Sequence, residues 1–134
     1  MKKIIFVCRH NRFRSKVAEA IFNKFNKNKN IKAESAGLFV DSTHLFIEPV
    51  VMSEMERRGY SLAGTPRQLT RELAEKFDKI IIVADDMDKE FFFDFEGKVT
   101  QWRIPDCDAS DVVGIEETID EIEKKVKDFA LKQK

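Results

Sequence analysis

Two short, uninterrupted runs of bulky apolar residues, Ile4–Val7 and Ile80–Val83, constrain the fold of this chain more than any other feature. A strand with one face in water alternates apolar and polar residues, whereas a continuous run of this length is typical of a strand buried on both faces of a parallel sheet. We therefore predict buried strands at both places, the first beginning at Lys2. Weaker runs over residues 31–35 and 99–104 predict two more strands.

Helical patterns occupy the intervals between these strands. The predicted helices cover residues 15–27, 49–58, 91–95 and 115–129, and residues 105–114 are predicted to form a loop. Ser15 is a residue type that often caps a helix N-terminus, and Pro49 and Gly59 suit the start and the end of the second helix. The last helix carries one apolar stripe, so one of its faces should pack on the core.

Strands that alternate with helices imply βαβ units, and hence an α/β fold with a parallel sheet. We expect a three-layer sandwich, in which helices flank both faces of a four-stranded parallel sheet. The length of 134 residues suits a single domain spanning 1–134. Because the carboxyl ends of parallel strands meet at one edge, where ligands usually bind, the loops at Cys8 and Asp106 should meet there.

Composition excludes several classes of protein. Equal numbers of basic and acidic residues, 24 of each, argue against a nucleic-acid partner. No apolar run approaches the ~20 residues that span a bilayer, so no membrane association is expected. The four apolar residues before Cys8 are too few for a signal peptide, and we expect a soluble, cytoplasmic protein. The two cysteines lack metal-ligand spacing, and we expect neither a metal nor another cofactor.

The segment from Cys8 to Ser15 forms a Cys-x5-Arg-Ser pattern between a predicted strand and a predicted helix. This arrangement points main-chain N–H groups and the positive end of the helix dipole at one anion. A cysteine there should be held as a thiolate nucleophile, and Arg14 can hold two phosphate oxygens. The Ser15 hydroxyl can donate to the sulfur. A small buried cysteine with surface arginines nearby is the alternative reading of the same residues.

The chain resembles the low-molecular-weight protein tyrosine phosphatases along nearly its whole length. The residues that carry the resemblance at the start are Ile4–Val7, Cys8, Asn11, Arg14, Ser15, Ala18, Glu19, Ala20 and Phe22. Further along, Ser35–Gly37 resembles the family's Ser-Ala-Gly turn, Phe77–Asp85 its third strand, and Trp102–Asp106 the strand and loop that deliver the general acid. Taken by itself, Asp106 after Pro105 also fits an ordinary turn.

The resemblance implies a flavodoxin-like fold and a phosphomonoester hydrolase, a protein tyrosine phosphatase that forms a phosphocysteine. Cys8 would attack phosphorus, Arg14 would hold the phosphoryl group, and Asp106 would protonate the leaving oxygen and later activate water. The implied substrate-binding residues are Arg9, His10, Asn11, Arg12, Phe13 and Ser15. The expected partner is a phosphotyrosine protein or a small phosphoester, and the expected state is a monomer or weak dimer.

The chain departs from the family pattern at three positions. His10 replaces a glycine and Phe13 replaces a second cysteine, so we expect Asn11 to take the positive φ, His10 to lie at the rim and Phe13 to pack beneath the loop. Cys107 follows Asp106 where proline is usual. We hypothesise that Cys107 forms a protective disulfide with Cys8. A partly buried thiol chosen for its size is an equally good reading of Cys107.

Residues at the mouth of the loop are expected to select the substrate. Phe39, His44 and Phe46 could supply an aromatic wall, and Arg9 and Arg12 a positive rim. Two other functions remain open. The first is an arsenate reductase that uses an external thiol, since a thiolate in an oxyanion loop also attacks arsenate. The second is a non-catalytic module that binds phosphate or a phosphoprotein.

Overall fold

The computed structural model describes residues 2–41, 43, 46–62, 64–88, 90, 92, 95 and 97–133 of the 134-residue chain. Its sheet has four strands, β1 (Lys2–Cys8), β2 (Ile31–Gly37), β3 (Lys79–Val83) and β4 (Val99–Trp102), in the order β2-β1-β3-β4. Every neighbouring pair is parallel. The α/β fold with a four-stranded parallel sheet is therefore confirmed.

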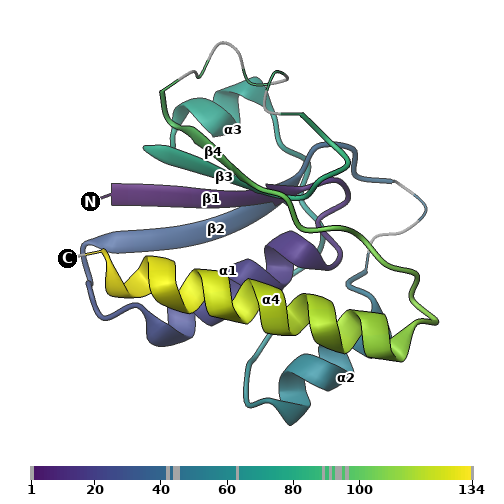
Figure 1. The fold of residues 1–134 in the computed structure, drawn as a ribbon. Coiled ribbons are helices and arrows are strands. Elements are labelled where there is room, and N and C mark those ends of the chain that lie inside the picture. Colours follow the sequence, from purple (N-terminus) through teal and green to yellow (C-terminus); the bar gives the residue numbers. More distant parts are fainter. Residues whose placement is uncertain are drawn as a thin grey trace.

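Four helices accompany the sheet: α1 (Arg14–Phe25), α2 (Pro49–Arg57), α3 (Arg71–Glu75) and α4 (Val112–Leu131). Figure 1 shows α1 and α4 side by side along one face of the sheet, with α2 beyond them and α3 on the other side. The layers are thus helices, sheet and helix. None of the described helices is both long and apolar enough to cross a membrane.

The alternation of side chains along β1 divides the core in two. Ile4 and Phe6 pack with α1, α2 and α4, whereas Ile5 and Val7 pack with α3. All four side chains are fully buried, which is why β1 is an uninterrupted apolar run.

Several predicted boundaries were wrong. Ser15 does not cap α1: Phe13 stands at the cap position without a side-chain bond, and Ser15 lies in the first turn. β4 ends at Trp102, two residues before the predicted end. α4 begins at Val112 because the side chain of Asp111 accepts a hydrogen bond from the Gly114 N–H, which shortens the predicted loop.

Helix α3 has five residues, too few for a periodic apolar pattern, and the sequence analysis missed it. The sequence feature that could have revealed this helix is Thr70, whose side chain accepts a hydrogen bond from the Leu73 N–H at the start of the helix. Of the predicted helix over residues 91–95, positions 91, 93 and 94 lie outside the described residues. Phe92 is buried and Phe95 half-buried, and both pack in the core with α3, as expected of core residues.

Candidate active site

The loop after β1 is short and rests on the end of β2. β1 ends at Cys8 and α1 begins at Arg14, so residues 9–13 join the two elements. Gly37 pairs with Cys8, and a Cβ at Gly37 would lie 2.8 Å from main-chain atoms of both His10 and Asn11. Only glycine leaves room for the loop at this point.

The peptide groups of this loop have a defined orientation. The carbonyls of Cys8, Arg9 and Arg12 accept hydrogen bonds from the N–H groups of residues 38, 39 and 48, which lie outside the loop. The Phe13 carbonyl accepts the first bond of α1. In a trans peptide the N–H points opposite to the C=O. The N–H groups of residues 9, 10, 13 and 14 therefore point toward the inside of the loop, where they form a cradle for an anion.

A hydrogen-bond chain fixes the direction of the Ser15 hydroxyl toward Cys8. Asn11 has φ 56°, as predicted, and its Nδ2 donates to Ser15 Oγ at 2.7 Å. Ser15 Oγ lies 2.9 Å from Cys8 Sγ. Because the Ser15 oxygen already accepts a bond from Asn11, its own proton is available to the sulfur. The geometry therefore favours Cys8 as an acceptor, which is the role of a thiolate.

Asn11 is itself held by residues outside the loop. Its Oδ1 accepts a hydrogen bond from the Arg67 N–H at 2.9 Å, and its Nδ2 also donates to Ser35 Oγ at 3.1 Å. Ser35 in turn donates to the carboxylate of Glu19. Asn11 and Ser35 are buried, so this network locks the loop from behind rather than contacting a ligand.

Arg14 is buried, with 2% of its surface exposed, and most of its donors have acceptors. Nη1 donates to the Ile104 carbonyl at 2.9 Å, and Nη2 lies 3.1 and 3.3 Å from the two carboxylate oxygens of Asp86. Asp85 is 3.9 Å from Nη1. Among the described residues, no acceptor faces Nε of Arg14, which is also buried. A phosphoryl oxygen would satisfy this donor.

A pocket of about 130 Å³ brings the three predicted catalytic residues together. Its lining consists of Cys8, His10, Arg12, Phe13, Arg14, Glu48, Val51, Asp106, Cys107, Ala109 and Ile115. Asp106 is exposed, and its Oδ1 accepts a hydrogen bond from the Cys107 N–H. A carboxyl group that lines the same pocket as the cysteine can exchange a proton with a leaving group.

Three predicted substrate-binding residues do not line this pocket. Asn11 and Ser15 lie behind the loop, where they support it. Arg9 is turned aside: its guanidinium stacks over the Phe39 ring at 5.2 Å and donates to the Asp86 carbonyl. His10, Arg12 and Phe13 do line the pocket.

The rim is less positive than the sequence analysis predicted. Arg12 lies 2.7 Å from Glu48, and its Nε donates to the Phe46 carbonyl, so its charge is paired. His10 is half-buried, and its Nδ1 bonds to the Phe39 carbonyl at 2.7 Å, which suits the predicted rim position. Phe13 is buried and packs in the main core, as expected.

The predicted aromatic wall does not border the pocket. Phe39 and Phe46 are 47% and 74% exposed and are absent from its lining, and His44 lies outside the described residues.

Cys107 shares the pocket with Cys8 and is half-buried. Burial raises the pKa of the Cys107 thiol, and its sulfur lies 3.9 Å from Thr118 Oγ1.

Sequence analysis missed two acidic residues of the site, Asp86 and Glu48. Asp86 follows the apolar run of β3 at the carboxyl edge of the sheet, and this position was a usable signal. Glu48 directly precedes α2, and no local pattern connects it to Arg12. Among the residues that the structure describes, no group of three or more His, Cys, Asp or Glu side chains could hold a metal ion.

Comparison with known proteins agrees with this geometry. The family model described as low molecular weight phosphotyrosine protein phosphatase matches residues 3–134. The chain belongs to this family. The resemblance expected from the Cys8 loop, the Ser35–Gly37 turn and the Trp102–Asp106 segment is thus confirmed.

Solved structures of low molecular weight phosphatases and of an arsenate reductase share the fold of this chain. The arsenate reductase from Archaeoglobus fulgidus is 28% identical, with a TM-score of 0.77 over 96% of this chain and 99% of that one. The YwlE arginine phosphatase from Geobacillus stearothermophilus is 22% identical, with a TM-score of 0.85 over 98% and 92% of the two chains. The low molecular weight protein tyrosine phosphatase from T. tengcongensis is 20% identical, with a TM-score of 0.86 over 98% and 99%.

Proposed function

We propose that this low molecular weight phosphatase hydrolyses phosphomonoesters through a phosphocysteine on Cys8, with phosphotyrosine in proteins as its substrate. The observation that carries the proposal is the cradle around Cys8. Inward N–H groups and the unpaired Nε of Arg14 offer hydrogen bonds to the phosphoryl oxygens. Donors held in this way stabilise the charge that develops as phosphorus passes from one partner to the other.

In the first step the Cys8 thiolate attacks phosphorus and the bond to the leaving oxygen breaks. Asp106 gives its proton to that oxygen, so that an alcohol or phenol departs rather than its anion. Asp106 lines the same pocket as Cys8, which is the placement that this role requires.

In the second step Asp106, now a carboxylate, takes a proton from water, and the hydroxide attacks the phosphocysteine. The sulfur–phosphorus bond breaks, and phosphate leaves Cys8 as a thiolate. The Ser15 hydroxyl donates to the sulfur in this state, which makes the thiolate a better leaving group. The two steps regenerate the Cys8 thiolate and the protonated Asp106, and the net reaction consumes one water molecule.

Phosphotyrosine is the substrate class in the description of the family, and it is proposed here on that basis. The structural neighbours include an arginine phosphatase and an arsenate reductase, which suggest two competing functions. The partner is a phosphotyrosine protein or a small phosphoester, and the protein acts as a monomer or weak dimer. The cytoplasmic location stays a prediction.

A substrate panel tests the proposal. The wild-type protein should hydrolyse p-nitrophenyl phosphate and phosphotyrosyl peptides, without sensitivity to EDTA. Cys8→Ser should abolish this activity, and Asp106→Asn should lower kcat by roughly 10²–10⁴-fold. Asp108→Asn removes an exposed carboxylate two residues away and should leave kcat unchanged.

Three results would contradict the proposal. Faster hydrolysis of a phosphoarginyl peptide than of a phosphotyrosyl peptide would show that phosphoarginine is the substrate of this protein. Thiol-dependent arsenate reduction without ester hydrolysis would assign a reductase. Tight phosphate binding without turnover of any ester would indicate a binding module.

A further inference from the structure

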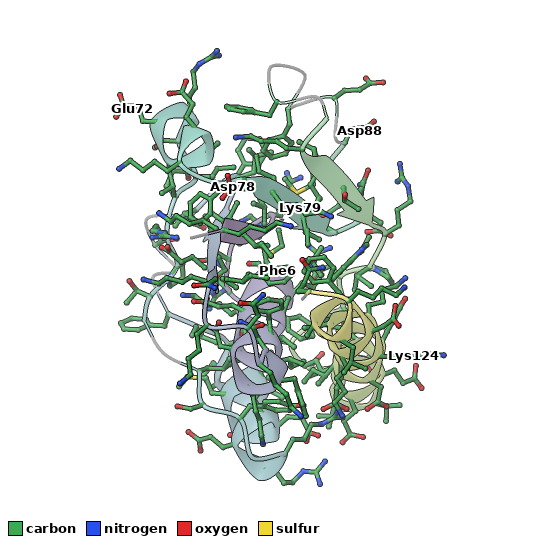
Figure 2. All side chains as sticks on the ribbon, turned by 90° about the vertical axis from the view of Figure 1, so that its left-hand side faces the viewer. Phe6, Glu72, Asp78, Lys79, Asp88 and Lys124 are labelled. Atoms are coloured by element: carbon green, nitrogen blue, oxygen red, sulfur yellow. The ribbon has the colours of Figure 1, made fainter. Side chains whose placement is uncertain are left out.

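Lysines gather at the end of the molecule opposite the pocket. Each of the four parallel strands has lysine at its amino end: Lys2 and Lys3 in β1, Lys32 in β2, Lys79 in β3 and Lys98 just before β4. Register places Lys3 beside Lys32, and Ile4 beside Lys79. Figure 2 looks onto this end of the sheet, with Asp78 and Lys79 near the middle of the view.

The α1–β2 connection and the end of α4 add further lysines to the same end. Lys2 Nζ lies 3.5 Å from Gln133 Oε1, and Gln133 shares with Lys27 and Lys29 the lining of a hollow of about 450 Å³. We define the lysine face as Lys2, Lys3, Lys27, Lys29, Lys32, Lys76, Lys79, Lys98, Lys127 and Lys132. All of these side chains are exposed or half-buried.

Few carboxylates compensate this charge. Asp128 pairs with Lys132 at 3.1 Å and Glu123 with Lys127 at 4.0 Å, while Asp78 accepts a hydrogen bond from the main-chain N–H of Lys3 at 2.7 Å. Because the whole chain has a formal net charge of zero, the excess of lysine here is balanced elsewhere. The opposite edge carries Glu48, Asp85, Asp86, Asp106, Asp108 and Asp111 together with Arg9, Arg12 and Arg14, and two of these arginines form ion pairs there. The overall balance therefore conceals an excess of lysine at the amino edge of the sheet.

Aromatic rings hold four ammonium groups of the lysine face in place. The pairs are Lys3 over Phe77 at 4.8 Å, Lys79 over Phe129 at 5.3 Å, Lys98 over Phe95 at 4.9 Å and Lys127 over Phe25 at 4.6 Å. Each contact restrains a flexible lysine stem, so less side-chain entropy is lost when the charge meets an anion. Each lysine also covers its ring, which keeps that ring from stacking on a nucleotide base.

We propose that the lysine face binds nucleic acid through the phosphate backbone, without reading its base sequence. Lysine is a point charge suited to single phosphates, whereas arginine can pair bidentately with guanine. Ten lysines make up the face, and Arg71 lies beside it, over the same Phe95 ring as Lys98. Dense positive charge on one end of a protein supplies sequence-independent affinity by releasing counterions from the phosphates. The proposal departs from the expectation, drawn from the overall charge balance, that the protein has no nucleic-acid partner.

The surface around the lysine face fits a polyanionic chain better than a bilayer. Among the described residues, Leu131, 74% exposed, is the large exposed apolar side chain at this end, and a single such residue gives little anchorage in lipid. Lys27 and Lys29 stand at a hollow whose lining also includes Phe25, Ala130 and Leu131, and their charges lie at its border.

The position of the lysine face predicts that binding of nucleic acid there does not affect catalysis in the pocket. The pocket lies at the carboxyl edge of the sheet and the lysine face at its amino edge. Bound nucleic acid therefore leaves the pocket open, and a ligand of the phosphate loop should not displace it.

Fluorescence anisotropy with a labelled 20-nucleotide RNA of mixed sequence tests the proposal. At about 50 mM salt the protein should bind with Kd of roughly 10⁻⁶–10⁻⁴ M, and log K should fall linearly with log salt, with a slope of about −0.7 for each phosphate neutralised. Scrambling the RNA sequence or adding saturating vanadate should change Kd less than about twofold, because neither alters phosphate contacts at the lysine face.

Lys27→Gln/Lys29→Gln/Lys32→Gln should weaken binding at least about tenfold and make the salt slope shallower by about 2. The matched control, Arg57→Gln/Arg103→Gln/Lys124→Gln, removes the same charge from exposed positions outside the lysine face and should bind RNA like the wild type. Both variants should hydrolyse p-nitrophenyl phosphate at the wild-type rate, which shows that they are folded.

Four outcomes would overturn the proposal. They are no measurable RNA binding at about 50 mM salt, equal weakening in the control variant, displacement of RNA by vanadate, and tighter binding to phosphatidylglycerol vesicles than to RNA. Displacement by vanadate would assign the binding to the phosphate loop, and tight vesicle binding would assign a membrane partner.

Discussion

Nη2 of Arg14 lies 3.1 and 3.3 Å from the two carboxylate oxygens of Asp86, while Nε of Arg14 has no hydrogen-bond partner among the described residues. With Nη1 on the Ile104 carbonyl, this contact fixes the plane of a buried side chain. Asp86 therefore positions the Arg14 side chain, and it is absent from the lining of the pocket.

Asp86→Asn should lower kcat for p-nitrophenyl phosphate by roughly tenfold or more, because a small displacement of Arg14 weakens its hold on the transition state. KM should change less than kcat. Asp88→Asn, which removes an exposed carboxylate on the same segment, serves as the control and should behave as wild type. An unchanged kcat in Asp86→Asn would show that Arg14 keeps its position without the carboxylate.

Gly37→Ala should disable the enzyme although position 37 is not in the pocket. The added Cβ would meet the main chain of His10 and Asn11 at 2.8 Å, so the phosphate loop would have to move. Gly97→Ala is the control, because its Cβ meets nothing within 4 Å and only its φ of 98° is strained. Both variants should lose stability, by about 1 kcal/mol at Gly97, but only Gly37→Ala should lose kcat. Equal kcat in the two variants would contradict the packing described for the loop.

The parts of the fold and site that follow from local sequence were predictable. Continuous apolar runs identified β1 and β3, and the Cys8-to-Ser15 pattern located the loop whose N–H groups turn inward. The positive φ of Asn11 followed from the absence of glycine in the loop.

Contacts between distant segments were not predictable in the same way. Arg12 was expected to be a free positive charge, but it pairs with Glu48, 36 positions away in the chain. The aromatic wall was inferred from the proximity of Phe39 and Phe46 in sequence to the Ser35–Gly37 turn, yet neither ring lines the pocket. Contacts between side chains that are far apart in the sequence depend on tertiary packing, and the residues around each side chain do not reveal them.

Peroxide should oxidise this phosphatase reversibly. Peroxide transfers an oxygen atom to Cys8, the Cys107 thiol then attacks the sulfenic acid, and water leaves as the disulfide forms. Both thiols line the same pocket. Intact mass should fall by about 2 Da, and a thiol reductant should restore hydrolysis. Cys107→Ser should be inactivated irreversibly, whereas equal recovery in both proteins would refute the disulfide.

The stability contributed by Glu54 should depend on pH. Hydrogen bonds from Arg57 and then Arg58 lower the pKa of Glu54 below its ordinary value of 4.5. Because the folded-state pKa is depressed, the contribution is complete above the unfolded value and disappears as pH falls through the folded value.

Glu54→Gln should therefore be less stable than the wild type by roughly 0.5–1 kcal/mol near pH 7, and the difference should shrink as pH falls below 4.5. Urea unfolding at a series of pH values measures this. Glu56→Gln, at an exposed position of the same helix, should show no such dependence. A difference that persists unchanged in acid would show that the Glu54 contacts are not ionic.

The central claim is that the sulfur of Cys8 accepts the phosphoryl group, and trapping that adduct tests it most directly. Asp106→Asn should be mixed with p-nitrophenyl phosphate, quenched in acid within milliseconds and analysed by peptide mass spectrometry. The account predicts a gain of about 80 Da on the peptide that contains Cys8, and no gain after Cys8→Ser. Continued hydrolysis by Cys8→Ser, with no adduct on Cys8 in any variant, would contradict it.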